Sequence, residues 1–299
     1  MTTKTELRVC YVLVADGWDR HAQMMWLSAT SLRLQEPEAK IVLATDAPSL
    51  ESFQRAAPQL LSLVDDVVVI DTPMEEKRLR AFHLKTLFRS HIDGDLLFLD
   101  GDTLVIKPLA AVLQHDAEIG AVLDFNHNGP WFPPQLEESY LRLGWTYPLE
   151  YYFNSGVLFL RDTPAVRAFA KEWTRRWLLL VGEGMPGDQE AFVSALYAMP
   201  VSWRRLPNAM NSITIKRNYR FREARVLHFF GSPAEQQGTI LEHLLKHLQA
   251  TGTFDHKAYG RCLREQHPWG PGYQPWQLWR SRNYVRAAGL KAWKVLTRR

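Results

Sequence analysis

Cysteine is scarce in this chain of 299 residues, which contains only Cys10 and Cys262. Two thiols make neither a disulfide framework nor a cysteine metal cluster, and they are typical of a reduced, cytoplasmic protein. Long apolar runs are also missing, since no stretch approaches the roughly 18 residues that span a bilayer. The first apolar run, residues 9–15, has no small-residue cleavage pattern behind it, so we expect no secretory signal.

Low-complexity composition is absent as well. With 17 glycines and 17 prolines, the chain has too little of either residue for a collagen-like or repetitive sequence. Hydrophobic residues make up 46% of the chain and charged residues 23%, which is the composition of a globular protein. The length fits one large α/β domain or two ordinary ones.

Acidic residues are absent from the last part of the chain, after Glu265. The basic residues of this tail are Arg280, Arg282, Arg286, Lys291, Lys294, Arg298 and Arg299. The whole chain has a net charge of +4, so the part before the tail is slightly acidic. A nucleic-acid-binding domain needs a basic face of its own, and we therefore expect no nucleic acid partner. The tail itself is expected to meet an anionic partner.

Apolar, β-branched segments alternate with helical segments in the first half of the chain. The expected strands are residues 8–15, 40–45, 64–70, 96–99 and 119–123, and the expected helices include residues 19–34 and 78–90. Continuous apolar strands separated by helices predict an α/β fold whose mostly parallel sheet is covered by helices on both faces. Ligands bind beyond the carboxyl ends of such strands, which directs attention to Asp16, Asp46, Asp100 and Asp102.

The second half adds a long irregular segment to this alternation. Residues 126–149 are rich in proline, glycine and aromatics without a clear period, and we interpret them as a functional loop or lid. Residues 153–160 begin polar and end as a strand, and a helix begins at Pro164 after a capping side chain. Asp188 is expected to cap another short helix, and residues 226–230 form a late strand.

The strongest chemical signal is a pair of carboxylates, Asp100 and Asp102, that leaves the end of a buried strand with one glycine between them. Both can reach one hard cation, and Mg²⁺ and Mn²⁺ prefer such oxygen ligands while leaving positions open for phosphate oxygens. Two chemistries use such a pair. In haloacid-dehalogenase-like phosphatases the first Asp accepts a phosphoryl group, although Leu104 stands here where that signature has Thr or Val. In the other chemistry the pair holds the metal that bridges a sugar-nucleotide diphosphate.

Five segments in sequence order resemble the GT-A glycosyltransferases, especially family 8 and related retaining sugar-nucleotide transferases. They are similar to that family's base-recognition turn, DxD segment, donor-sugar strand, DQD segment and metal-binding strand. In this order the segments are Val14-Ala15-Asp16, Asp100-Gly101-Asp102, Asn154-Ser155-Gly156, Asp188-Gln189-Glu190 and His228-Phe229-Phe230-Gly231. The resemblance covers residues 14–231 and implies a GT-A-like, Rossmann-like fold.

The resemblance assigns the metal site to Asp100, Asp102 and His228, with Mn²⁺ or Mg²⁺ as the expected ion. Histidine offers a neutral nitrogen and suits Mn²⁺ better than Mg²⁺. The metal offsets the charge that develops on the departing diphosphate, which is Lewis-acid catalysis without a proton donor. Lys85, or Arg80 in the same helix, would contact phosphate or the donor sugar.

The remaining roles concern the sugar-nucleotide donor. Asn154 and Ser155 are assigned to the donor sugar, because Asn154 offers both donors and acceptors to hydroxyls, and Gly156 lets the backbone approach closely. Asp188 is expected to face the anomeric carbon, and Gln189 to orient the donor or an intermediate. The family's metal-binding strand usually continues to a lysine that reaches the diphosphate. Residues 232–234 contain no lysine, and the candidate substitutes are Lys216, Arg217 and Arg220.

The basic tail has the pattern of an amphipathic helix. Basic residues lie opposite an apolar face, and Trp276 and Trp279 precede the helix. The apolar face consists of Tyr284, Val285, Ala288, Ala292, Val295 and Leu296. Basic, aromatic and amphipathic character together suit an anionic membrane surface. The alternative is a helix that packs on the domain and leaves its basic side in solvent.

These observations lead to one hypothesis about organisation and function. Residues 1–232 are expected to form the catalytic domain, and residues 233–299 a C-terminal helical extension. The enzyme would move a hexose from a nucleotide diphosphate sugar, with a UDP-sugar as the expected donor, to a glycan or lipid-linked acceptor. It would work in the cytoplasm, including at the inner face of a membrane. The alternatives are the phosphatase and a catalytically silent sugar-nucleotide-binding protein or lectin.

Overall fold

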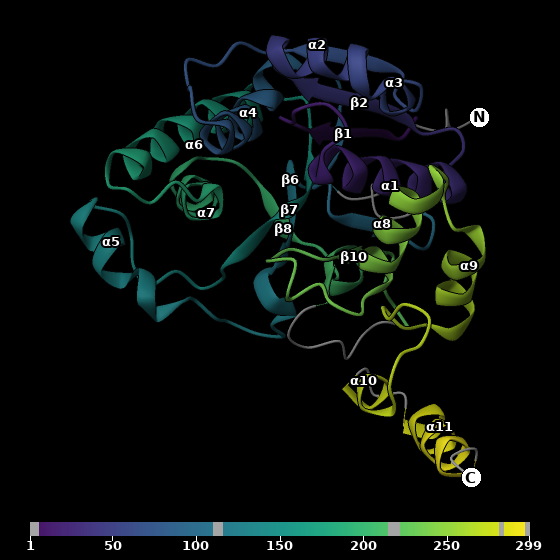
Figure 1. Ribbon diagram of the computed structural model, residues 1–299. Coiled ribbons are helices and arrows are strands. Elements are labelled where there is room, and N and C mark those ends of the chain that lie inside the picture. Colours follow the sequence, from purple (N-terminus) through teal and green to yellow (C-terminus); the bar gives the residue numbers. More distant parts are fainter. Residues whose placement is uncertain (1–5, 110–115, 215–221, 281–283, 297–299) are drawn as a thin grey trace, which may run out of the picture.

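A seven-stranded sheet forms the centre of the computed structural model, which describes residues 6–109, 116–214, 222–280 and 284–296 (Figure 1). In order across the sheet, the strands are β3 (Asp66–Val69), β2 (Lys40–Thr45), β1 (Arg8–Val12), β4 (Leu96–Leu99), β7 (Phe153–Leu160), β6 (Ile119–Leu123) and β8 (Trp203–Arg205). Strand β7 runs antiparallel to β4 and β6, and the other neighbours pair in parallel. The predicted mostly parallel sheet is therefore confirmed.

Helices cover both faces of this sheet, as the sequence predicted. Successive residues of a strand point to opposite faces, so alternate side chains enter two different cores. Tyr11 and Leu43 pack with α1 (Arg20–Gln35), α2 (Ala47–Ala56) and α3 (Pro58–Leu61). Cys10 and Val42 face the core formed with α4 (Lys77–His91), α6 (Pro164–Gly182) and α7 (Asp188–Ala198).

Three expected elements differ in detail from the structure. Strand β3 lies at the edge of the sheet with Val67 and Val69 exposed, so it is not the buried strand expected there. All eight residues of β7 are strand and all are buried, including its polar start. Gly187 is the N-cap of α7, and Asp188 is the first residue of the helix with no capping hydrogen bond. The side chain of Asp188 is therefore not a cap.

A second, three-stranded sheet joins distant parts of the chain. It contains β5 (Thr103–Val105), β10 (Val226–His228) and β9 (Ser212–Ile213), in that order. Strand β10 runs antiparallel to β5, and the register places His228 opposite Thr103. The sequence predicted β10 but neither of its short partners. This pairing brings His228 beside the turn that holds Asp100 and Asp102, because that turn leads directly into β5.

Residues 126–149 carry more regular structure than an irregular loop would. They include η3 (Pro134–Leu136) and α5 (Glu137–Arg142). Phe132 makes edge-on ring contacts with Tyr140, Tyr147 and Tyr152. Edge-to-face aromatic pairs contribute stability beyond the burial of their surface. The segment is thus held by its aromatic side chains against the residues that lead into β7.

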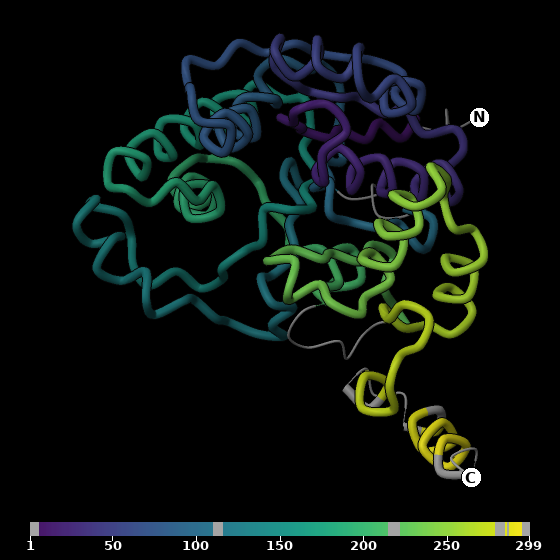
Figure 2. Tube along the Cα trace, in the orientation of Figure 1, coloured from purple at the N-terminus to yellow at the C-terminus, as the bar shows by residue number. Residues whose placement is uncertain are grey.

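Four helices follow the second sheet. Helices α8 (Ile240–Thr251) and α9 (His256–Glu265) share a hydrophobic core with α1 and β10, which includes Leu27, Leu227 and Leu244. Helices α10 (Pro275–Arg280) and α11 (Tyr284–Leu296) project from this body, as the trace in Figure 2 shows. Among the described residues, no helix is long and apolar enough to cross a membrane.

The apolar face expected for the tail lies in solvent as far as it is described. Val285 is 87% exposed, and Ala288 and Ala292 are exposed as well. Helix α11 packs instead through Ala287, in a small apolar cluster with Leu278 and Trp269. The side chains outside the described part of the tail are those of Trp279, Arg280, Tyr284, Arg286, Val295 and Leu296, together with residues 281–283 and 297–299.

Candidate active site

A cleft of about 890 Å³ opens at the carboxyl ends of β1 and β4, where the sequence predicted a ligand site. The structure brings together in its lining most of the residues expected there. These are Lys85, Asp100, Asp102, Asn154, Ser155, Asp188, Gln189 and His228. They come from α4, the turn after β4, β7, α7 and β10, so the fold gathers them from sequence positions far apart.

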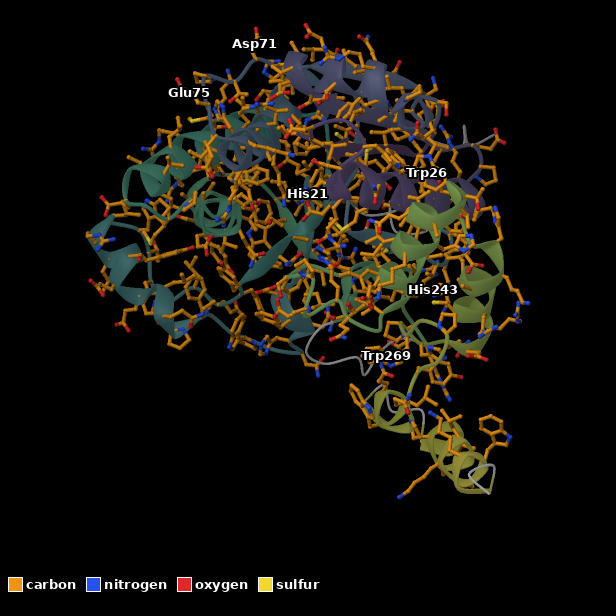
Figure 3. The ribbon with its side chains drawn as sticks, in the orientation of Figure 1. His21, Trp26, Asp71, Glu75, His243 and Trp269 are labelled. Carbon is orange, nitrogen blue, oxygen red and sulfur yellow. The ribbon has the colours of Figure 1, made fainter. Side chains whose placement is uncertain are left out.

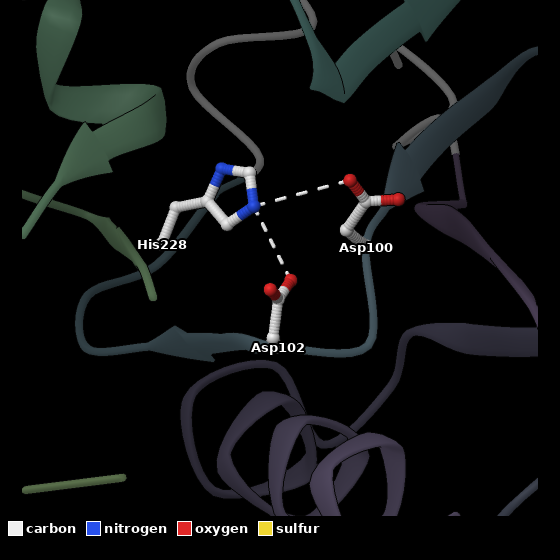
Figure 4. Close-up of side chains that lie close together, drawn as sticks. All are labelled: Asp100, Asp102 and His228. Atoms are coloured by element: carbon white, nitrogen blue, oxygen red, sulfur yellow. Dashed lines mark ion pairs between the residues drawn. The ribbon is translucent and has the colours of Figure 1, made fainter. Parts of the chain in front are cut away.

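Asp100, Asp102 and His228 line the cleft and lie close together (Figure 4). The Nε2 atom of His228 is 3.2 Å from an oxygen of Asp102 and 3.9 Å from an oxygen of Asp100. One ligand atom from each residue lies within 4.8 Å of the other two. Two carboxylates and one imidazole at this spacing match the ligand preferences of Mn²⁺, and the two carboxylates alone match those of Mg²⁺.

The imidazole of His228 is oriented by Asn211. His228 Nδ1 lies 2.9 Å from Asn211 Oδ1, and Asn211 Nδ2 donates to Asn154 Oδ1 at 2.7 Å, so the amide presents its oxygen to the ring. Nδ1 is therefore protonated, and Nε2 is the ring nitrogen that faces the two carboxylates. Nε2 is buried beside Asp102, and no well-formed hydrogen bond satisfies it within the described chain. A divalent cation would take the place of a proton on Nε2, so His228 fits a metal ligand.

The electrostatic field of this group favours positive charge. Burial opposes a charged imidazole, but the carboxylates of Asp102 and Asp100 outweigh burial and raise the pKa of His228. Burial also prevails at Asp100 and raises the pKa of its carboxyl, although Lys85 opposes this shift. A site that stabilises a proton between two carboxylates will also stabilise a divalent cation in that place.

Gly156 leaves the space in which these groups meet. A Cβ atom at this position would lie 2.3 Å from His228 Cε1 and 2.7 Å from an oxygen of Asp100. It would also lie 3.0 Å from Asn154 Oδ1. No side chain fits at these distances, so the glycine is required by the close approach of three polar side chains. The sequence analysis had assigned Gly156 to a different purpose, a close approach of the backbone to the donor.

Lys85 links Asp188 to the group of Asp100, Asp102 and His228, which is the candidate metal group. Its Nζ lies 3.0 Å from Asp100 and 3.2 Å from Asp188 Oδ2, and 3.4 Å from the hydroxyl of Ser155. Burial disfavours the ammonium, but the two carboxylates outweigh burial and raise the pKa of Lys85. The lysine is therefore charged, and it holds Asp188 within the same cleft as the metal group.

A network of amides continues from this group toward β6. Asn154 Nδ2 donates to Asp124 Oδ1 and to Gln189 Oε1, both at 3.0 Å. Asp124 is 5% exposed, and burial raises the pKa of its carboxyl. The sequence analysis missed Asp124 and Asn211. Asp124 did carry a signal, because it directly follows an apolar strand in the manner of Asp100.

Two expected donor-binding residues, Arg80 and Asp16, are not among the residues that line the cleft. Arg80 pairs with Asp46 at 2.7 Å and lines a separate hollow of about 410 Å³. Asp71 and Glu75 line the same hollow at the outer edge of the molecule (Figure 3). Asp16 is largely exposed and pairs with Lys77 at 3.0 Å. The candidates Lys216, Arg217 and Arg220 lie outside the described residues.

Arg20 and Arg78 line the cleft without a carboxylate partner in the part of the chain that the structure describes. The guanidinium of Arg20, in the first turn of α1, donates to the side-chain oxygen of Gln236. Arg78 lies over the ring of Phe82 at 5.4 Å. Lys77 and Lys85, in contrast, are already paired with carboxylates. Among the described residues of the cleft, these two arginines form no ion pair, although Arg20 also lowers the pKa of the Glu242 carboxyl.

Replacing Asn211 by leucine should lower the affinity of the cleft for Mn²⁺ by about 10- to 100-fold, because residues that orient a metal-binding histidine have effects of this size. The imidazole would lose the acceptor that fixes its tautomer. Asn211→Asp keeps the acceptor for the ring but loses the donor to Asn154 Oδ1, so its loss of Mn²⁺ affinity should be smaller than that of Asn211→Leu. Titration of free Mn²⁺ by electron paramagnetic resonance measures the affinity. The control is Asn208→Leu, since the buried amide of Asn208 bonds the carbonyl of Asn126 and not His228; an equal loss in both leucine variants would contradict the role of Asn211.

No family model and no curated protein matches the sequence. Among solved structures, the galactosyltransferase LgtC in complex with donor and acceptor sugar analogues aligns with a TM-score of 0.58 at 18% identity, over 85% of this chain and 100% of that chain. An active-site glutamine-to-glutamate mutant of LgtC aligns over the same shares at 18% identity and a TM-score of 0.55. Mouse xyloside xylosyltransferase 1 aligns with a TM-score of 0.51 at 14% identity, over 77% of this chain and 99% of that chain. The chain has the fold of these glycosyltransferases, which confirms the predicted GT-A-like fold.

Proposed function

We propose that the chain is a metal-dependent glycosyltransferase that moves a hexose from a nucleotide diphosphate sugar to a glycan or lipid-linked acceptor. The observation that carries this proposal is the pairing of β10 with β5. In a glycosyltransferase fold, it places the buried Nε2 atom of His228 beside Asp100 and Asp102. These three residues would hold Mn²⁺ or Mg²⁺. When bound, the ion supplies positive charge to the departing diphosphate.

The charges of the cleft support a diphosphate ligand. Arg20 and Arg78 have no carboxylate partner among the described residues and line the same cleft as the metal group. Guanidinium groups bind phosphate oxygens in a bidentate manner, so these two arginines are candidates for the diphosphate beside Lys216, Arg217 and Arg220, which lie outside the described residues. A UDP-sugar is the first donor to test.

The residues around Asp188 support a sugar beside the diphosphate. Asn154 and Gln189 present amides, and Asp188 Oδ2 is buried with no hydrogen bond within the described chain. Lys85 Nζ lies 3.2 Å from Asp188 Oδ2 and holds this carboxylate in the cleft. An ionised carboxylate stabilises the positive charge that develops at an anomeric carbon as the leaving group departs. We place the anomeric carbon against Asp188, and the resemblance favours retention of its configuration.

A comparison of substrates tests the function directly. Purified protein with MnCl₂ should release UDP from UDP-glucose or UDP-galactose, and EDTA should stop the release. The phosphatase alternative requires hydrolysis of p-nitrophenyl phosphate instead, with Asp100 as the nucleophile. A silent binding protein would bind UDP without releasing it from any sugar nucleotide. Release of UDP from neither donor nor from a wider panel of nucleotide sugars would refute the proposal.

We also propose that residues 275–299 dock the enzyme on an anionic membrane surface, as part of the extension that begins at residue 233. Trp276 and Trp293 are 54% and 59% exposed on helices that project from the body. Basic residues surround them in the sequence, and none of the neighbouring residues is acidic. Exposed aromatic rings with basic neighbours favour the interface of an anionic bilayer. Such docking would raise the local concentration of a lipid-linked acceptor.

Removal of residues 276–299 should leave hydrolysis of the donor largely unchanged and should abolish binding to anionic vesicles. Each basic residue contributes about 1 kcal/mol near an anionic bilayer, which suffices for reversible attachment. Co-sedimentation with phosphatidylglycerol vesicles measures binding, which should weaken as salt screens the charges. The full-length variant with Lys291→Glu and Trp293→Ser repeats this test without a truncation. Both side chains are exposed, so the substitutions retain the fold. Failure of the parent chain to bind anionic vesicles at low salt would contradict the proposal.

A further inference from the structure

A buried glutamine, Gln236, lines the cleft just beyond the strand that carries His228. Its side chain is only 2% exposed. Nε2 donates to the Phe229 carbonyl at 2.6 Å, with the Gly231 carbonyl at 3.5 Å, and Oε1 accepts from the guanidinium of Arg20. A carbonyl only accepts and a guanidinium only donates, so this is the one orientation of the amide that satisfies both ends. Gln236 is thus a fixed bridge to Arg20.

Phe229 connects this bridge to the metal group. It is fully buried and directly follows His228. Its amide donates to the Asp102 carbonyl at 3.0 Å, and its carbonyl accepts from Gln236. A short series of hydrogen bonds therefore runs from the backbone of Asp102 to the guanidinium of Arg20. These bonds fix the guanidinium relative to the metal group.

Arg20 reaches Gln236 from a distant part of the sequence, 216 positions earlier. It is the first residue of α1, is half-buried and lines the cleft. The carboxylate of Asp19 accepts from the amides of His21 and Ala22, so these amides of the first turn are already bonded. The guanidinium has five donors, and its bond to Gln236 leaves others for a ligand. The side chain of Arg20, and not the end of the helix, is what α1 offers to an anion.

The partner of Arg20 is uncharged, which distinguishes this arginine from two other cations of the cleft. Lys77 and Lys85 also line the cleft, and each pairs with carboxylates that offset part of its charge. Arg20 bonds the neutral amide of Gln236 instead. An amide can orient a guanidinium without neutralising it. The positive charge of Arg20 is therefore retained for a ligand.

Glu242 is the acidic residue that senses this charge, since Arg20 contributes to the lowering of the pKa of its carboxyl. Both oxygens of Glu242 have other partners. One lies 2.8 Å from Nζ of Lys246, and the other accepts from the amide of Gly238. Within the described chain, Glu242 forms no ion pair with Arg20, so it does not replace the amide as the anchor.

We propose that Gln236 is a positioning residue that holds the guanidinium of Arg20 for the diphosphate of the donor. Residues 232–234 contain no lysine, so the loop after β10 supplies an anchor and α1 supplies the cation. A guanidinium that is already oriented loses less freedom when it binds phosphate oxygens. The inference rests on the proposed glycosyl transfer, and it assigns part of diphosphate binding to one arginine and its uncharged anchor.

Isothermal titration calorimetry tests this pair without turnover. The ligands are UDP and inorganic pyrophosphate, each added with Mg²⁺ to full-length protein. Arg20→Met should weaken both ligands about tenfold, because a charge-assisted bond to phosphate is lost. Gln236→Leu should weaken both about three- to tenfold, because the guanidinium remains but loses its anchor. Parent affinity for both ligands in Arg20→Met overturns the proposal, even if Gln236→Leu does not fold, and so does a parent chain that binds neither ligand.

A double variant separates positioning from a general effect on the loop. If Gln236 acts through Arg20, adding Gln236→Leu to Arg20→Met should change either affinity by less than about twofold. Equal losses in the parent chain and in Arg20→Met would mean that Gln236 acts independently of the arginine, and they would overturn the proposal. The control is Gln23→Leu, which removes another buried glutamine of α1. Gln23 bonds Gln249 and does not line the cleft, so both affinities should stay unchanged.

The outcomes distinguish this inference from the proposed function. In turnover, Gln236→Leu should raise the KM of the donor with a smaller effect on kcat. If the parent chain releases UDP from a sugar nucleotide but neither single variant raises that KM or weakens UDP, the positioning role is wrong and glycosyl transfer stands. If pyrophosphate binding follows the expected pattern but no sugar nucleotide is turned over, the proposed activity fails and the diphosphate-binding pair stands. Thermal unfolding of each variant checks that the fold is retained.

Discussion

Replacing Gly156 by alanine should lower turnover of the sugar nucleotide by about 100-fold or more, although the substitution adds a single methyl group. Its Cβ would lie 2.3 Å from His228 Cε1 and 2.7 Å from an oxygen of Asp100. His228 is held by Asn211 and Asp100 by Lys85, so neither side chain can move without breaking a buried contact. A displacement of about 1 Å at a catalytic group is enough for a 100-fold loss.

The neighbouring glycine of the carboxylate motif provides the matched control. A Cβ at Gly101 would meet the Cβ of Met25 at 3.3 Å, which a small shift can accommodate. Gly101→Ala should therefore cause a much smaller loss of turnover than Gly156→Ala. Mn²⁺ affinity, measured by electron paramagnetic resonance, should follow the same order. Normal Mn²⁺ affinity in Gly156→Ala would show that the metal ligands do not meet at this glycine.

The carboxylate pair and His228 show which parts of the site the sequence alone can reveal. Asp100 and Asp102 lie within three residues at the end of an apolar strand, so local sequence contains the whole signal. His228 reaches Asp100 and Asp102 only through the pairing of β10 with β5, and the expected strand did not itself specify its partner. Strands β5 and β9 have three and two residues, which is too short for a periodic pattern.

Two of the basic residues of α4 show the same limit. Arg80 and Lys85 were equal candidates for the donor, yet they are five residues apart and point to different sides of the helix. The structure directs Lys85 to Asp100 and Arg80 to Asp46, which lies at the start of α2. Helical periodicity predicts that the two side chains diverge, but it does not say which side faces the ligand.

The positioning residues were missed for a related reason. Asn211 acts on His228 through a fold-dependent contact between η4 (Asn208–Asn211) and β10, and an isolated asparagine in a sequence carries no such information. In the tail, the helical wheel found an apolar face that lies in solvent, whereas Ala287 is buried against Leu278 and Trp269. Local pattern identifies the helix, and tertiary contacts decide which of its faces is buried.

Replacing Asp102 by asparagine should nearly abolish divalent-dependent turnover and leave the fold intact. Burial opposes ionisation of Asp102, but His228, Lys85 and a backbone hydrogen bond together outweigh burial and lower the pKa of its carboxyl, which favours the anionic form that binds a cation. Asparagine keeps the size of the side chain and removes that charge. The folding core is unaffected, because Asp102 lies at the cleft and is 21% exposed.

The loss should amount to about 100-fold or more in turnover at moderate Mn²⁺, as expected when a major charge that assists the leaving group is removed. UDP release measures turnover, and paramagnetic resonance measures the accompanying loss of Mn²⁺ affinity. Asp71→Asn is the control, because Asp71 also follows a strand end but lines the separate hollow. Thermal unfolding in EDTA should give similar midpoints for all three proteins. Turnover equal to that of the parent chain at saturating Mn²⁺ would mean that the reaction does not depend on a metal held by Asp102.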